Sequence, residues 1–187
     1  MASVCWLVVT SVYAVPATYT ITGIGTGALG DEVFSLSPFS IVAEADTDDI
    51  GTIPGIFSVP NTRTTATIDG IGSAEFNSTI RTSSNQAFSR AGFGDFGGPG
   101  NFAILFVDNN LFASYDLGTS IGPLGGPVLL VNSVGQPTGT TAGDFYLTSV
   151  QDALFTAVVV PEPNSFLLIS ALFVGLGAAG RRRITMK

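Results

Sequence analysis

The sequence contains no histidine and one cysteine, Cys5, and its single lysine is the last residue, Lys187. Without histidine, the chain has neither a Ser-His-Asp triad nor most kinds of zinc site. If the N-terminal segment is removed, no cysteine is left for a disulfide bond or a thiol nucleophile. The position of the lysine also excludes Schiff-base chemistry and a Walker-type phosphate loop in the body of the chain. The catalytic option that remains is a pair of carboxylates, as in glycosidases.

Charged residues are also scarce, at 11% of the chain, and they are unevenly distributed. Residues 15–160 carry thirteen acidic side chains but only three basic ones, Arg63, Arg81 and Arg90. A body this acidic repels nucleic acid and anionic lipid headgroups, so we expect no nucleic-acid partner. Two interpretations of the acidity stay open: it keeps a β-rich surface soluble, or it attracts cations.

Glycine is abundant, with 23 residues, and short stretches of the body alternate between apolar and polar residues. A period of two predicts half-buried β-strands, and the Gly- and Pro-rich stretches between them predict turns. No stretch before Phe166 has the 3.6-residue period of an amphipathic helix. The stretches predicted as strands are 18–25, 39–45, 65–72, 74–80, 102–107, 111–117, 127–134, 143–150 and 153–160.

The fold class predicted from this pattern is all-β, with an antiparallel β-sandwich-like domain built from about ten strands. Stretches 102–107 and 111–117 are separated only by Asp108-Asn109-Asn110, which favours a hairpin because Asn and Asp tolerate positive φ. Phenylalanines are spread over the whole body and can fill one core. They are Phe34, Phe39, Phe57, Phe76, Phe88, Phe102, Phe106, Phe112, Phe145 and Phe155.

The N-terminal segment, residues 1–17, resembles a secretory signal peptide. Its apolar run extends from Val4 to Val9 and more weakly beyond, and small residues at 12–14 or 15–17 offer cleavage sites. No Lys or Arg precedes the apolar run, so we expect the signal to be truncated or to start upstream. The alternative is that the segment forms a buried first strand.

An uncharged segment, Ser165–Gly180, lies near the other end of the chain. Its 16 residues would form a helix about 24 Å long, at the short limit for crossing a membrane. The basic cluster Arg181, Arg182 and Arg183 follows at once, as in a stop-transfer sequence held in the cytoplasm. We therefore predict a single C-terminal transmembrane helix and an extracytoplasmic body; the alternative is a buried core helix.

Three features occur in order at the C-terminus: Pro161-Glu162-Pro163, the apolar segment, and the arginine cluster. The two prolines hold the chain extended and keep Glu162 at the membrane surface. This arrangement over residues 158–187 resembles the C-terminal sorting signal of PEP-CTERM proteins of Gram-negative bacteria. Residues 18–157 then form the extracytoplasmic β-rich domain.

The resemblance implies that an exosortase, a membrane-bound cysteine protease, is a transient partner and cuts near Pro161–Pro163. It implies a protein held in the inner membrane before processing and delivered afterwards to the cell surface or the extracellular medium. It also implies a link to exopolysaccharide and biofilm. We accordingly expect an exported, non-catalytic surface or matrix protein.

The densest acidic cluster suggests calcium as the one cofactor to consider. It consists of Glu44, Asp46, Asp48 and Asp49, and with Gly51 it matches the opening of an EF-hand loop but not the rest of that motif. A carbohydrate- or calcium-binding, lectin-like module is therefore the alternative function. The alternative is that the cluster is a solvated turn at the end of a strand and binds no metal.

A secreted glycosidase is the less favoured third hypothesis. Two acids on either side of a sugar bond would be needed, and the only tryptophan, which could stack on a sugar, is in the N-terminal segment. The sequence offers four aspartates but cannot pair them: Asp95, Asp108, Asp116 and Asp144.

Overall fold

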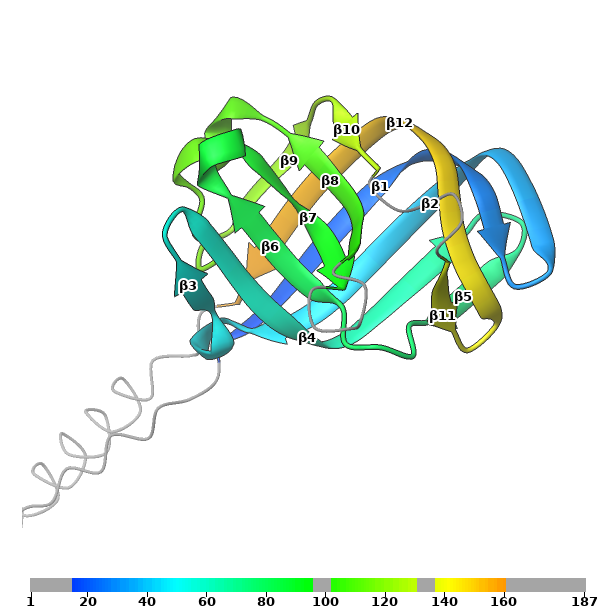
Figure 1. Ribbon diagram of the computed structural model, residues 1–187, viewed down its shortest axis with the longest axis horizontal. Helices are drawn as coiled ribbons and strands as arrows, with labels where there is room; N and C mark the ends of the chain where they lie inside the picture. Colours follow the sequence, from blue (N-terminus) through cyan, green and yellow to red (C-terminus); the bar gives the residue numbers. More distant parts are fainter. Residues whose placement is uncertain (1–14, 96–101, 131–136, 161–187) are drawn as a thin grey trace, which may run out of the picture. The chain divides into compact units, whose positions relative to one another are not determined.

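The strands form one antiparallel sheet that curls over its own inner face (Figure 1). This computed structural model describes residues 15–95, 102–130 and 137–160. Twelve strands are found in these ranges: β1 (Pro16–Leu29), β2 (Glu32–Asp46), β3 (Gly51–Ile53), β4 (Ile56–Ile68), β5 (Gly72–Glu75), β6 (Arg81–Asn85), β7 (Arg90–Asp95), β8 (Phe102–Asp108), β9 (Ile121–Gly125), β10 (Val128–Leu129), β11 (Thr138–Thr140) and β12 (Gly143–Val159). The predicted all-β, antiparallel architecture is confirmed.

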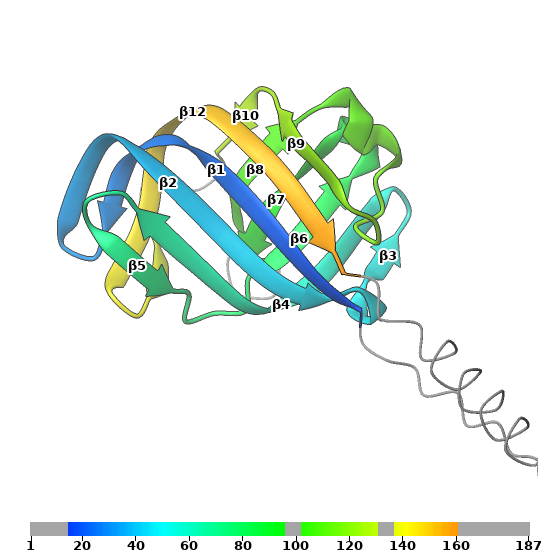
Figure 2. The same ribbon diagram turned by 180° about the vertical axis from the view of Figure 1, so that it is seen from behind.

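The strand order is β10-β8-β7-β6-β4-β2-β1-β12-β11, with β3 and β5 also paired to β4 and β9 paired to β12. The long strands β1, β2 and β12 lie nearer the viewer in Figure 2, whereas β6, β7 and β8 lie nearer in Figure 1. The two layers of the expected sandwich are thus parts of one continuous sheet.

Strand β4 connects the two layers. Its first part, Ile56–Pro60, pairs with β6, and the part from Asn61 onward pairs with β2. The register with β2 shifts at this point. Glu44 of β2 pairs with Arg63, but the next residue, Ala45, pairs with Asn61, so one residue of β4 is left unpaired between them. Such a bulge bends a strand and increases its twist, so β4 can leave one layer and enter the other.

A buried polar network holds this bend. The side chain of Asn61 accepts a 2.8 Å hydrogen bond from Thr82 Oγ1 and donates one of 3.2 Å to Thr64 Oγ1. Its backbone N–H donates to the carbonyl oxygen of Ile80 at 2.9 Å. All three polar side chains are buried. Because buried polar groups without partners are costly, the network favours this one path of the chain.

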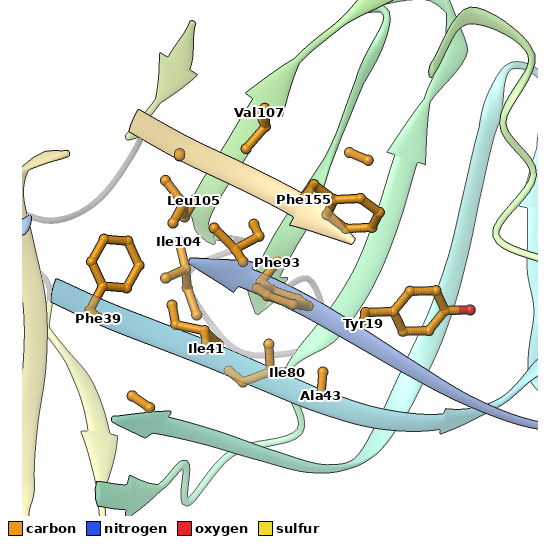
Figure 3. Packing of buried hydrophobic residues seen from close by; sticks show 14 of the residues in the cluster. Tyr19, Phe39, Ile41, Ala43, Ile80, Phe93, Ile104, Leu105, Val107 and Phe155 are labelled. Atoms are coloured by element: carbon orange, nitrogen blue, oxygen red, sulfur yellow. The ribbon is translucent and has the colours of Figure 1, made fainter. Parts of the chain in front are cut away.

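The core lies between the layers and follows the alternation of the strands. Tyr19 of β1 and Phe155 of β12 face Phe93 of β7 and Leu105 of β8 (Figure 3), and Ile21 of β1 belongs to the same buried cluster. Each of these five side chains has no exposed surface. Burial of a large apolar side chain contributes about 1.5–3 kcal/mol, so these contacts dominate the stability of the fold.

The predicted phenylalanine core is correct for most positions but wrong for two. Phe88 is 65% exposed because it lies on a short 3-10 helix, η2 (Gln86–Phe88), and not on a strand. Phe106 is buried but does not belong to the core cluster. It alternates with the core residues Leu105 and Val107 and therefore points to the outer face of its layer.

The segment that carries β9 and β10 joins the two margins of the curled sheet. β9 pairs with β12, and β10, which begins three residues later, pairs with β8. Between them the chain passes so close to β8 that a Cβ on Gly126 would overlap the carbonyl oxygen of Asp108. Glycine is required here for the close approach of two backbones.

The predicted hairpin around Asp108-Asn109-Asn110 is wrong. After β8 the chain enters a 3-10 helix, η3 (Asn110–Ser114). The side chain of Asn109 caps this helix by accepting a 3.0 Å hydrogen bond from the N–H of Leu111. Phe112 is thereby placed in the core, where it packs edge-on against Phe155. Capping and burial of an aromatic ring override the local turn signal.

The C-terminal stretches 143–150 and 153–160, predicted as two strands, form the single strand β12. Asp152 has a φ of 52°, and the pairing with β1 shifts register beside it. The interruption in the sequence pattern is therefore a bulge within one strand and not a turn between two.

The two ends of the described domain are hydrogen-bonded to each other. Ala17 of β1 pairs with Val159 of β12, and the N–H of Val160 donates to the carbonyl oxygen of Pro16 at 3.0 Å. The core cluster lies entirely between Ala17 and Ala157, within the compact unit Ala14–Val160. A fragment of residues 15–160 therefore retains the whole core and can fold alone.

No helix among the described residues is long and apolar enough to cross a membrane. The predicted transmembrane segment lies in residues 161–187, outside the described residues, as does most of the predicted signal peptide.

Candidate functional site

A groove of about 600 Å³ crosses the outer face of the layer that contains β6, β7 and β8. This volume lies within the range of small-molecule sites, about 300–1,000 Å³. The groove belongs to the layer nearer the viewer in Figure 1. Its lining residues are Gly51, Thr52, Ile53, Ile56, Ser58, Arg81, Ser83, Asn85, Phe88, Arg90, Phe106 and Leu129.

The register of the strands explains why this face is hollow. One row of paired residues crosses six strands, from β3 to β10, and five of its six members line the groove, Gly92 being the exception. Four neighbours in the row are glycine or serine, and the row ends in two large apolar residues. In spatial order the row is Gly51, Ser58, Ser83, Gly92, Phe106 and Leu129. Small side chains form the floor and larger ones in the adjacent row form the wall.

The adjacent row supplies that wall and is also set by pairing. It contains Ile53, Ile56, Asn85, Arg90 and Asp108, in spatial order. The first four line the groove, and Asp108 does not. Ile53 is 63% exposed. This wall is therefore apolar at its β3 end and polar where it crosses β6 and β7.

Arg81 on β6 is held against the floor of the groove. Its Nε donates to Ser58 Oγ at 2.9 Å, and its Nη2 donates to the carbonyl oxygen of Ser58 at 3.4 Å. Ser83 Oγ also donates to Ser58 Oγ, at 3.0 Å. These bonds fix one side of the guanidinium group and leave the Nη1 side free of any hydrogen bond to the described residues.

Arg81 is also the one described arginine without a carboxylate partner. Arg63 pairs with Glu75 at 3.4 Å, on the exposed surface. Arg90 pairs with Asp108 at 3.1 Å. A domain with a large excess of acidic groups thus presents an uncompensated positive charge inside a largely apolar groove.

Arg90 forms a second fixed contact of the groove. Two of its nitrogens face the two carboxylate oxygens of Asp108, Nε at 3.1 Å and Nη2 at 3.3 Å. Its guanidinium carbon lies 5.0 Å from the centre of the Phe88 ring, a cation–π contact. Because Asp108 compensates its charge, Arg90 adds little net charge to the groove. Its main contribution is to the shape of the groove wall.

The predicted calcium ligands are found at the end of β2 and in the 3-10 turn η1 (Thr47–Asp49) that follows it. Asp46 caps this turn by accepting a 2.9 Å hydrogen bond from the N–H of Asp48. Glu44, Asp48 and Asp49 are exposed. No three acidic side chains in the described ranges are grouped as metal ligands. Calcium binding stays a prediction.

The four aspartates considered for a glycosidase lie on separate elements. Asp108 is engaged by Arg90, Asp116 accepts a 3.0 Å hydrogen bond from the N–H of Gly118, and Asp144 is exposed at the start of β12. Asp95 ends β7, and its side chain lies outside the described part.

Asp116 affects two tyrosines beside it. Tyr19 Oη donates to the carbonyl oxygen of Leu117 at 2.8 Å. Burial raises the pKa of Tyr19 and of Tyr115 well above the usual value, and the negative charge of Asp116 raises both further. Both tyrosines belong to the core, whereas Asp116 is exposed.

The sorting motif Pro161, Glu162, Pro163 and the basic cluster Arg181, Arg182, Arg183 lie outside the described residues. Sequence reasoning missed the groove, because the small residues of its floor come from three strands whose register no local pattern shows. Comparisons of the chain with protein-family models, with curated proteins and with solved structures give no match.

Proposed function

We propose that the chain is an exported, non-catalytic bacterial surface or matrix protein that is sorted through its C-terminal segment. The observation that carries this proposal is the order of three features in the tail: Pro161-Glu162-Pro163, the uncharged segment Ser165–Gly180, and the arginine cluster. This tail resembles a PEP-CTERM sorting signal, with an exosortase as its transient partner.

The proposed architecture is a two-layered β ectodomain followed by a single C-terminal transmembrane helix. The boundary of the folded domain supports it, since β12 ends at Val159 and the motif begins two residues later. Cleavage at the motif would leave every strand of the domain intact. The first strand and the last strand are paired, so removal of both flanking segments would not open the sheet.

Cell fractionation tests the proposal with two versions of the full chain in a host that has an exosortase. The wild type is compared with the Pro161→Ala/Pro163→Ala double variant. We expect the wild type to lose mass and leave the inner membrane, and the double variant to stay there at higher mass. Identical mass and location of the two would contradict sorting through this motif.

A second candidate role for the ectodomain is a carbohydrate- or calcium-binding, lectin-like module, and the acidic cluster at the end of β2 and in η1 is the observation that favours it. Calorimetry of residues 15–160 with calcium tests the metal part. Heat that disappears in an Asp46→Asn/Asp48→Asn variant would support it, and no heat at millimolar calcium would contradict it. Thermal shift with exopolysaccharides tests the carbohydrate part.

A further inference from the structure

We infer that the groove binds a linear amphiphile that has one carboxylate head group and an apolar chain. The head group would pair with Arg81, and the chain would lie along the floor of small residues. This inference concerns the folded domain alone and does not depend on the route of export.

The charge of the groove selects an anionic head group. Its lining contains two arginines and, among the described residues, no carboxylate. Since Arg90 is already paired with Asp108, Arg81 supplies the net charge. The side of its guanidinium that carries Nη1 has no partner among the described residues, and a guanidinium edge fits a carboxylate with two parallel hydrogen bonds.

The head-group site is held in place before a ligand arrives. Ser58 Oγ accepts hydrogen bonds from both Arg81 and Ser83, and Ser83 is buried although it lies on the outer face. A guanidinium fixed in this way loses little freedom on binding, which favours affinity. Arg81 is also only partly exposed, so water weakens its attraction for an anion less than on an open surface.

The rest of the groove selects an apolar chain over a sugar. Its larger side chains are apolar at both ends, with Ile53 and Ile56 on one side and Phe106 and Leu129 on the other. The polar groups of Ser58, Ser83 and Arg90 are largely used in bonds to one another and to Asp108. A sugar ring needs several free hydrogen-bonding groups, whereas a hydrocarbon chain needs only this apolar surface.

The dimensions also suit a chain of this kind. From β6, which carries Arg81, to β10 there are three strand spacings of about 4.8 Å, or about 14 Å. The extended chain of dodecanoate can cover such a distance. We therefore take dodecanoate as the probe.

Calorimetry of residues 15–160 with dodecanoate, below its micellar concentration, tests the inference. We expect saturable binding at one site. Dodecyltrimethylammonium has the same chain with the opposite charge and should bind at least about tenfold more weakly, because it forms no charge-assisted bond to Arg81. No saturable binding of dodecanoate at millimolar concentration, or equal binding of the two amphiphiles, would overturn the inference.

Two pairs of variants locate the site. Arg81→Gln should weaken dodecanoate binding by about tenfold or more, while Arg63→Gln, which changes an exposed ion pair elsewhere, should leave it unchanged. A Cβ on Gly51 would lie 3.7 Å from its nearest neighbour, so Gly51→Phe can fill the groove without a backbone clash. Gly139→Phe, on β11, is its matched control.

Circular dichroism and melting temperature show whether each variant folds. Folded Arg81→Gln and Gly51→Phe variants that bind as tightly as the wild type would overturn the assignment. An oligomer of uronic acid supplies carboxylates without an apolar chain. If that oligomer bound with dependence on Arg81 and dodecanoate did not, the groove would be a site for acidic sugar and the inference would be wrong.

Discussion

Replacement of Asn61 by alanine tests the junction between the two layers. Its side chain bonds to Thr82 Oγ1 at 2.8 Å and to Thr64 Oγ1 at 3.2 Å. Thr82 has no exposed surface and Thr64 is 4% exposed, so bulk water does not reach either hydroxyl group. The variant would therefore leave two buried polar groups without their partner.

The cost follows from these two groups. Each buried polar group that loses its partner costs about 1–3 kcal/mol, so we expect Asn61→Ala to lower the free energy of unfolding by roughly 2–6 kcal/mol. The total free energy of unfolding of a natural domain is about 5–15 kcal/mol. The loss is therefore a large fraction of the total and is measurable.

Urea denaturation of residues 15–160 is the assay, with the midpoint expected to fall at unchanged slope. Thr67→Val is the control, because Thr67 Oγ1 forms a 2.8 Å hydrogen bond with Ser73 Oγ on the exposed surface. This control should cost less than about 0.5 kcal/mol. If Asn61→Ala costs no more than the control, the network does not hold the bend in β4.

Three further predictions concern the hydrophobic core, the close backbone contact between Gly126 and β8, and stability at alkaline pH. Phe155→Ala should destabilise the domain by about 3–5 kcal/mol, since the ring has no exposed surface. Gly126→Ala should cost about 1–3 kcal/mol, because the added Cβ overlaps a backbone carbonyl oxygen of β8 and the chain must shift. Raised pKa values of Tyr19 and Tyr115 predict that the contribution of these two groups to stability is fully present below pH about 10 and is lost above it. There the unfolded chain loses protons that the folded chain keeps, at up to about 2.7 kcal/mol per pH unit for both groups.

The controls for these predictions use the same urea assay. Leu111→Ala, at a 60% exposed position, should cost far less than Phe155→Ala, and Gly51→Ala, which meets no close neighbour, far less than Gly126→Ala. For the pH effect, a Tyr19→Phe variant should lose about half of the alkaline slope. If a variant and its control lowered the free energy of unfolding equally, the argument for that position would be contradicted. If Tyr19→Phe left the alkaline decrease in stability unchanged, the argument from the tyrosine pKa values would be contradicted.

The strands near the N-terminus were predictable because one face of each strand is apolar and buried and the other is more polar and more exposed. Tyr19 and Ile21 alternate with threonines on β1, and Phe39 and Ile41 begin the same alternation on β2. A period of two is sufficient evidence of a strand when one face is buried and the other is not. The all-β class follows directly from this local pattern.

The path of the chain and the groove were not predictable in the same way. The hairpin at Asp108 failed because the burial of Phe112, a tertiary effect, favours a 3-10 helix after β8. The floor of the groove depends on register, which pairs Ser58 with Ser83 and Ser83 with Gly92. A shift of one residue would turn these side chains to the other face, and no local sequence feature fixes it.

Intact mass of the protein recovered from a native-like host, measured together with its location, tests the central claim most directly. The account predicts loss of both flanking segments, a new C-terminus near Pro161–Pro163, and recovery at the cell surface or in the medium. Recovery in the membrane fraction with the tail through Lys187 still attached would contradict sorting, and would indicate a permanently anchored surface protein.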